Sequence, residues 1–283
     1  MKEKICVVTG ASRGVGQGIA LALGAQGATV YVTGRSRQEA DSPLGGTVAA
    51  TAAEVTARGG QGIAAYCDHG DTASVAALFE RIRREQGHID VLVNNAIALP
   101  DELTLVKPFW RKSLGELALI DVGMRSSYVS TWHAAPLLLE SKGLVVFTSS
   151  FGGTCYMHGP AYGAGKAGTD KMAHDMAVDF KPHGVTAVSL WLGLVKTART
   201  VAVCGAEPEK YGPAFKVAES PEFAGRVIAA LYGDPQRQEL TGTIQVAAEL
   251  AKRYGVTDLD GRQPPSYRRA LGNPPEFSAA VVE

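Results

Sequence analysis

The stretch Ile5-Cys6-Val7-Val8-Thr9-Gly10-Ala11-Ser12-Arg13-Gly14-Val15-Gly16 begins as a short apolar run and ends in a glycine-rich turn. The apolar run is rich in β-branched residues, which is typical of a strand buried on both faces. Beyond the turn, Ile19, Ala20 and Leu23 recur at helical spacing, so the glycines join a strand to a helix. In such a turn, backbone N–H groups and the helix dipole bind a phosphate. Glycines lack side chains and therefore let the phosphate approach the backbone closely. The residues expected to bind phosphate are Gly10, Ser12, Arg13, Gly14, Val15 and Gly16.

The composition favours one large core and small-molecule chemistry. The chain has 283 residues, of which 46% are hydrophobic, and this suits a single α/β domain. Its 28 basic and 28 acidic residues leave no electrostatic footprint for nucleic acid or an anionic membrane. No apolar run approaches the roughly 18 residues of a membrane span, and residues 1–4 show no signal peptide. The four cysteines lack disulfide or metal-ligand spacing, so we expect free thiols, no metal site and a cytoplasmic protein.

Strand-like and helix-like segments alternate along the chain, which predicts a doubly wound parallel sheet with helices on both faces. The expected strands are residues 5–8, 28–33, 61–68, 90–95, 144–149, 185–191 and 243–246, and the clearest helices are 75–86 and 163–183. We therefore expect one Rossmann-type domain of about seven strands over residues 1–283, with a core at 1–250 and a C-terminal extension at 251–283. Ligands bind such a sheet beyond the carboxyl ends of its strands.

Tyr162 and Lys166 lie four residues apart, and Ser149 precedes Tyr162 by 13 residues. Positions i and i+4 of a helix are neighbours, so the Lys166 ammonium can lie beside the Tyr162 phenol. A free tyrosine has a pKa near ~10, and a neighbouring positive charge shifts this pKa towards neutrality, where proton transfer to a substrate oxygen is efficient. The pair therefore predicts a proton-donating centre.

The spacing G-x-x-x-G-x-G from Gly10 to Gly16, together with Tyr162 and Lys166, resembles the short-chain dehydrogenase/reductase family. The resemblance implies that Tyr162 delivers a proton, that Lys166 also holds the nicotinamide ribose, and that a serine binds the substrate carbonyl. Ser150 competes with Ser149 for that last role, but the 13-residue interval to Tyr162 and the glycine at 152 favour Ser149. Family resemblance further implies a homodimer or homotetramer.

Residues after other strands match the family's cofactor contacts. Asn95 and Ala96 follow the fourth strand and resemble the motif that lines the cofactor, while Asp68 follows the third strand and matches the acid placed beside adenine. After the sixth strand, Thr197 stands where a hydroxyl holds the nicotinamide carboxamide. All of these positions fall at the expected carboxyl edge of the sheet.

Three positions depart from the family pattern. Ile97 and Leu192 replace a usual glycine and a usual proline. Gly123 stands where the family usually has an asparagine that holds a water in the proton relay from Lys166 to solvent. These departures favour one alternative, a non-catalytic NADPH-binding or sensing protein on the same fold. The complete Ser149, Tyr162 and Lys166 set opposes it.

Charge at the end of the second strand favours NADP(H) over NAD(H). A cofactor without the 2′-phosphate is usually held there by an acidic side chain that accepts from the ribose hydroxyls. In this chain Arg35 occupies that place, and Arg13 adds a guanidinium from the glycine turn. The rigid fork of arginine suits a phosphate, so we expect NADP(H) as the cofactor.

Two late runs, residues 250–255 and 258–262, resemble a carbonyl reductase of the same family. The resemblance implies NADPH-dependent reduction of steroid-, prostanoid- or xenobiotic-like ketones to alcohols. An epimerase or dehydratase on the same scaffold is a further alternative, and the spacing from Gly10 to Gly16 argues against it.

We expect residues 196–220 to form an irregular substrate lid. The candidate pocket walls are Phe109, Trp110, Phe151, Tyr156, His158 and Trp191.

Overall fold

Seven parallel strands form one sheet in the order β3-β2-β1-β4-β5-β6-β7. The computed structural model describes residues 1–282. The strands are β1 (Ile5–Val8), β2 (Thr29–Gly34), β3 (Gln61–Tyr66), β4 (Val91–Asn94), β5 (Leu144–Ser150), β6 (Thr186–Leu192) and β7 (Ile244–Val246). Each coincides with a predicted strand, so the doubly wound parallel sheet is confirmed. The order reverses at β1, with β2 on one side and β4 on the other, which is where such sheets bind ligands.

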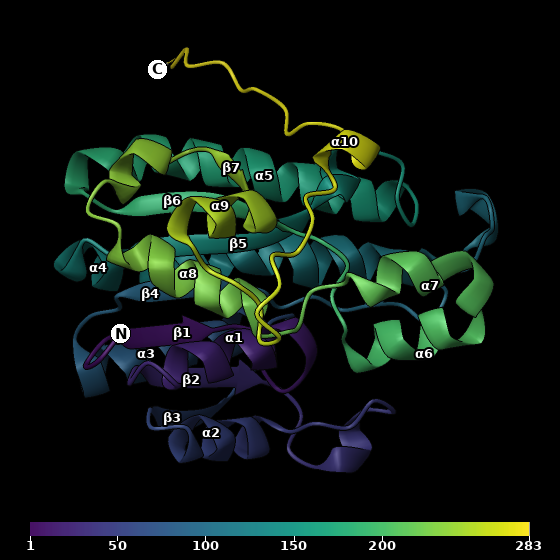
Figure 1. The fold of residues 1–283 in the computed structure, drawn as a ribbon. Coiled ribbons are helices and arrows are strands. Elements are labelled where there is room, and N and C mark those ends of the chain that lie inside the picture. The colour runs from purple at the N-terminus through teal and green to yellow at the C-terminus, as the bar shows by residue number, and fades with distance from the viewer. Residues whose placement is uncertain (283) are drawn as a thin grey trace.

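Helices cover both faces of this sheet (Figure 1). The helices are α1 (Gly14–Gly24), α2 (Val48–Ala57), α3 (Thr72–Gln86), α4 (Ser126–Ser141), α5 (Pro160–Phe180), α6 (Ala198–Ala206), α7 (Pro208–Lys216), α8 (Phe223–Gly233), α9 (Ala247–Tyr254) and α10 (Arg268–Leu271). Successive strand residues point to opposite faces, so Cys6 and Val8 pack with α1 and α8, while Ile5 and Val7 pack with α3, α4 and α5. Two apolar cores therefore enclose the sheet.

The helix that carries Tyr162 begins at Pro160, three residues before the predicted start. Proline is favoured in the first turn of a helix because its φ is already helical and its missing N–H has no partner there. The helix continues to Phe180 and is followed by a 3-10 turn and by Gly184, which has a φ of 78°. Tyr162 consequently lies in the first turn of α5, at the carboxyl edge of the sheet.

The prediction that residues 196–220 are irregular is wrong, because most of this segment is helical. Thr197 accepts a hydrogen bond from the Thr200 amide and begins α6, and Pro208 begins α7. Proline and capping residues occur both at the first turn of helices and in loops. The sequence pattern alone does not distinguish these two positions. The two helices project from one end of the sheet (Figure 1).

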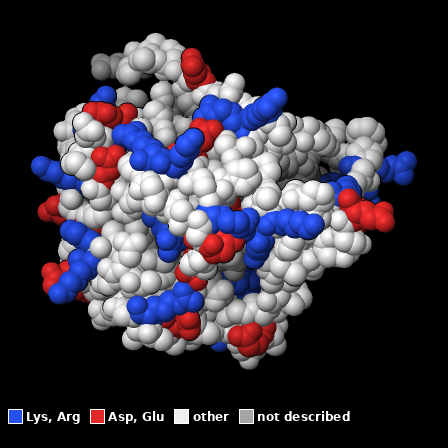
Figure 2. Space-filling model, viewed as in Figure 1, with Lys and Arg blue, Asp and Glu red and all other residues white. Residues whose placement is uncertain are grey.

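The C-terminal part of the chain contributes to the core. Helix α9 runs across the expected boundary at residue 250, and Leu250 and Ala251 are buried in the same apolar core as residues of α1 and α8. On the face shown in Figure 2, basic and acidic side chains are interspersed. Within residues 1–282, we find no helix with the length and apolar character needed to cross a membrane.

Candidate active site

The glycine-rich turn forms a cradle of bare backbone between β1 and α1. Gly10 has a φ of 66°, a conformation that favours glycine. A Cβ on Gly10 would lie 2.7 Å from the Ala96 Cα, and a Cβ on Gly16 would overlap the Gly10 carbonyl oxygen. Side chains are therefore excluded from the surface that faces the N-terminus of α1. This shape and its N–H groups fit the pyrophosphate of a dinucleotide.

The turn is braced by the residues that follow β4. The Thr9 hydroxyl accepts from the backbone N–H groups of Asn95 and Ala96 at 2.8 and 2.9 Å. In return, the Asn95 side-chain amide donates to the Thr9 carbonyl at 2.9 Å. Sequence reasoning missed Thr9, although a threonine directly between a buried strand and a glycine turn was a usable signal. Thr9 and Asn95 hold the two strand ends together at the cradle.

Arg13 and Arg35 both carry positive charge near the end of β2. The Arg13 side chain donates to the Ser36 hydroxyl at 2.7 Å and to the Gly46 carbonyl at 3.2 Å, while Arg35 is exposed. Burial and, after it, the positive charge of Arg35 lower the pKa of Arg13. Arginine side chains at this strand end suit an anionic ligand, because a guanidinium group donates hydrogen bonds to phosphate oxygens.

The remaining predicted cofactor residues also border this edge of the sheet. Asp68 is exposed just beyond β3, and its carboxylate accepts from the Gly70 amide at 2.9 Å. The Thr197 methyl lies 3.7 Å from where a Cβ on Gly14 would stand, so the end of β6 adjoins the glycine turn. His69 was missed: its Nε2 lies 2.7 Å from the Thr33 hydroxyl, and burial lowers its pKa to about 4. This histidine is therefore neutral at physiological pH.

The structure places Ser150, and not Ser149, beside Tyr162. The Ser150 hydroxyl lies 3.0 Å from the Tyr162 hydroxyl, whereas the Ser149 hydroxyl donates to the Lys166 carbonyl at 3.5 Å. Neighbouring residues of a strand point to opposite sides, so only one of the two serines can reach Tyr162. Ser150 is therefore the serine next to Tyr162, and the assignment of Ser149 to the substrate carbonyl stays a prediction, because residue spacing along the chain does not set the phase of the pleat.

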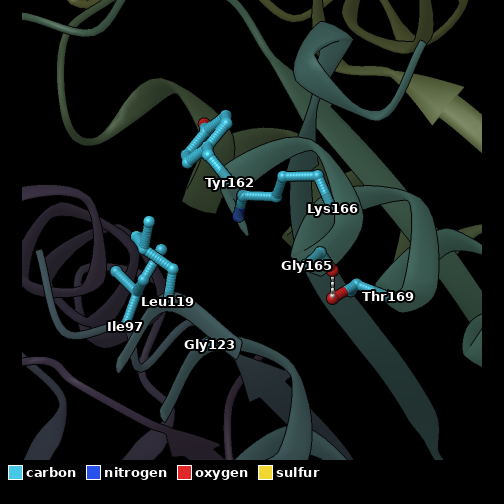
Figure 3. A pocket seen from close by; sticks show the side chains of 7 residues that line it. All are labelled: Ile97, Leu119, Gly123, Tyr162, Gly165, Lys166 and Thr169. Carbon is cyan, nitrogen blue, oxygen red and sulfur yellow. Dashed lines mark hydrogen bonds between the residues drawn. The ribbon is translucent and has the colours of Figure 1, made fainter. Parts of the chain in front are cut away.

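Lys166 extends towards Tyr162 from the next turn of α5 (Figure 3). Its Nζ donates to the Thr148 carbonyl at 3.0 Å and lies 5.8 Å from the centre of the Tyr162 ring. Burial lowers the pKa of Lys166 to about 8, and the charge of Asp170 opposes this change. Burial also raises the pKa of Tyr162, and the hydrogen bond with Ser150, rather than the Lys166 ammonium, opposes it. Tyr162 is therefore a neutral phenol at physiological pH, which is the form that donates a proton.

Two of the departures from the family pattern lie against each other. Between α5 and the π-helical segment Leu119–Arg125 is a small cavity lined by Ile97, Leu119, Gly123, Tyr162, Gly165, Lys166 and Thr169 (Figure 3). A Cβ on Gly123 would lie 3.3 Å from Cγ1 of Ile97. The Ile97 side chain thus occupies space that an asparagine at position 123 would enter. The residues at positions 97 and 123 are therefore sterically coupled.

Most of the side chains predicted as pocket walls do not pack on Tyr162. Phe151 and Trp191 are buried against each other, with ring centres 4.9 Å apart, and Phe109, Trp110 and Tyr156 are exposed. Only His158 packs on Tyr162, edge to face at 5.1 Å, and its φ of 61° shows that the loop before α5 is tightly turned. Aromatic composition did not distinguish core, surface and pocket positions.

The fold and this site define a nicotinamide-dependent oxidoreductase class, and the chain belongs to the short-chain dehydrogenase/reductase family, whose "short chain dehydrogenase" model matches residues 4–206. The mouse (Mus musculus) protein named dehydrogenase/reductase SDR family member 1 is 42% identical over 279 residues, covering 94% of this chain and 87% of that protein. The human (Homo sapiens) protein of the same name is 39% identical with the same coverage. A crystal structure of a putative dehydrogenase from Xanthomonas campestris has a TM-score of 0.74 at 26% identity, covering 99% of this chain and 98% of that one.

Proposed function

We propose that the protein is an NADPH-dependent carbonyl reductase that converts ketones of apolar small molecules, of steroid, prostanoid or xenobiotic type, to alcohols. The observation that carries the proposal is the Tyr162 hydroxyl, held 3.0 Å from Ser150 at the carboxyl edge of the sheet with Lys166 one turn away. Following NADPH absorbance with a panel of ketones and quinones tests it, and turnover of at least one apolar ketone is the expected result.

Each residue of the site has a distinct task in this reaction. Ser150 donates a hydrogen bond to the substrate oxygen, and Tyr162 transfers a proton to that oxygen. Lys166 supplies positive charge next to Tyr162 and would hold the nicotinamide ribose. Bound NADPH supplies the hydride. The residues that would hold NADPH are Gly10, Ser12, Arg13, Gly14, Val15, Gly16, Arg35, Asp68, Asn95, Ala96, Tyr162, Lys166 and Thr197.

The setting of the reaction is part of the same proposal. The balanced surface charge supports a small molecule, and not a nucleic acid, as the partner. All four cysteines are free, which supports a reducing compartment such as the cytoplasm. Tyr128 and Trp132 expose apolar area on α4 and support a homodimer or homotetramer.

The paired arginines lead to a prediction about cofactor choice. NADPH should bind at least tenfold more tightly than NADH, a difference of roughly 1.4 kcal/mol that one arginine–phosphate contact supplies. Arg35→Ala should remove most of this preference, and Arg13→Ala should act in the same direction. Arg37→Ala is the matched control, since Arg37 is on the same loop but stacks 4.2 Å over the Tyr66 ring. Fluorescence titration gives the affinities, and equal values for NADPH and NADH contradict the assignment.

The coupled positions Ile97 and Gly123 lead to a second prediction, which separates a reductase from a protein that only binds NADPH. In a reductase, protons reach Lys166 without an asparagine, so Gly123→Asn and the double variant Ile97→Gly/Gly123→Asn should change kcat and its pH dependence only modestly. The double variant gives the asparagine room that Ile97 otherwise takes. An inert wild type with activity appearing only in the double variant would show that the natural chain is a binding protein.

A further inference from the structure

Asp170 is a buried acid on the helix that carries Tyr162 and Lys166. The three residues are each four positions apart on α5, so they lie along one helix face. Asp170 is 1% exposed, whereas Asp175 and Asp179 on the same helix are exposed. Burying a carboxylate is costly unless it is hydrogen-bonded or paired with an opposite charge. The position of Asp170 therefore requires a physical explanation.

The Asp170 carboxylate connects α5 to both strands behind the site. It accepts from the Ser189 hydroxyl of β6 at 2.6 Å and from the Trp191 indole N–H at 3.0 Å. Burial raises the pKa of Asp170, while Ser189, then Ser149 of β5, then Trp191 lower it by stabilising the ionised form. A Cβ on Gly153 would lie 2.7 Å from Oδ2, so the turn after β5 also packs on the carboxylate. Asp170 thus holds α5 against β6 and packs against the turn that follows Ser150.

Lys166 lies one helical turn before Asp170, and its positive charge is one of the causes that lower the pKa of Asp170. The hydrogen bond from Nζ to the Thr148 carbonyl does not neutralise the ammonium. Burial lowers the pKa of Lys166, and within residues 1–282 Asp170 is the charged group that raises it. The groups that face this pair are Tyr162 of α5, Thr148 and Ser149 of β5, Ser189 and Trp191 of β6, and Leu119 and Gly123 of the π-helical segment. The groups from the strands and the π-helical segment carry no charge.

We propose that Asp170 is a positioning residue of the reductase, the counterion that keeps Lys166 in its ammonium form and the anchor that holds α5 against β6. The inference rests on the proposed function, because it assigns Lys166 a task in cofactor binding and proton transfer. The sign of the effect follows from electrostatics. Removing a neighbouring negative charge favours neutral lysine, so without Asp170 the ammonium loses its proton at a lower pH.

The test is the variant Asp170→Asn, which keeps an acceptor for Ser189 and removes the charge. The alkaline limb of the kcat profile should move to lower pH by about one unit. The alkaline weakening of NADPH binding should move in the same direction, measured by fluorescence titration without any substrate. If the wild type reduces no ketone, the proposed function fails, while the binding titration still decides the role of Asp170.

Two control variants separate charge from structure. Asp175→Asn removes the same charge from an exposed position on α5, where Asp175 pairs with Lys171 at 2.6 Å. Ser189→Ala removes a hydrogen bond to Asp170 but leaves its charge. Both controls should keep the alkaline limb of the wild type. The proposal is overturned if the alkaline limb of the kcat profile of Asp170→Asn lies at the wild-type pH. It is also overturned if Ser189→Ala shifts that limb as far as Asp170→Asn does.

If Asp170→Asn does not fold, the double variant Asp170→Asn/Lys166→Met replaces it. An unpaired buried ammonium is strongly destabilising, and the double variant no longer contains one. We therefore expect the double variant to fold and to unfold at a higher temperature than the single variant, measured by circular dichroism. A double variant that is no more stable than the single variant overturns the counterion role.

Discussion

Replacing Tyr162 by phenylalanine should lower kcat for ketone reduction by about 10³-fold, while the Kd for NADPH changes less than about twofold. The loss corresponds to roughly 4 kcal/mol of transition-state stabilisation. The physical reason is that only the hydroxyl is removed, and this hydroxyl is the proton donor beside Ser150. The ring keeps its packing against His158 and the turn at Gly152, so the cofactor site stays intact.

The matched control for Tyr162 is Tyr156→Phe. Tyr156 lies in the loop before α5 and is 81% exposed, so its hydroxyl is not part of the site. This variant should keep wild-type kcat. Wild-type activity in Tyr162→Phe would remove the assignment of Tyr162 as the acid, and an equal loss in both variants would point to a general effect on the loop.

The two neighbouring serines should differ sharply. Ser150→Ala should lower kcat by about 10²-fold, because a hydrogen-bond donor to a developing oxyanion is lost. Ser149→Ala should change kcat less than about threefold and lower the free energy of unfolding by about 1 kcal/mol, since Ser149 bonds inside the protein. Steady-state kinetics and urea unfolding of both variants check this. The reverse order of activities would show that Ser149, as the residue spacing suggests, is the substrate donor.

Much of the fold was predictable because its signals are local. Each buried strand is a short apolar run. The glycine turn and the Tyr162–Lys166 pair each lie within a few neighbouring residues of the sequence. The helices α6 and α7 were not predicted, because prolines and capping residues mark both helix starts and loops. Phe109 and Trp110, which the sequence predicts as pocket walls, are exposed, because an aromatic side chain carries no sequence signal of its burial.

The part of the site that could not be predicted depends on tertiary contacts. Which of Ser149 and Ser150 reaches Tyr162 is decided by the pleat of β5 against α5. Burial raises the pKa of Tyr162, which a helix spacing argument about Lys166 cannot anticipate. Asp170 receives its hydrogen bonds from β6, about twenty residues further along the chain, so its sequence neighbours give no sign of them.

One measurement tests the central claim most directly: mixing the purified protein with NADPH and each ketone of an apolar panel, while NADPH absorbance and the alcohol product are quantified together. The account predicts that at least one ketone yields one alcohol for each NADPH consumed. Saturable binding of NADPH without consumption by any ketone or quinone of the panel would contradict it, and the protein would then be a nicotinamide-binding protein without reductase activity.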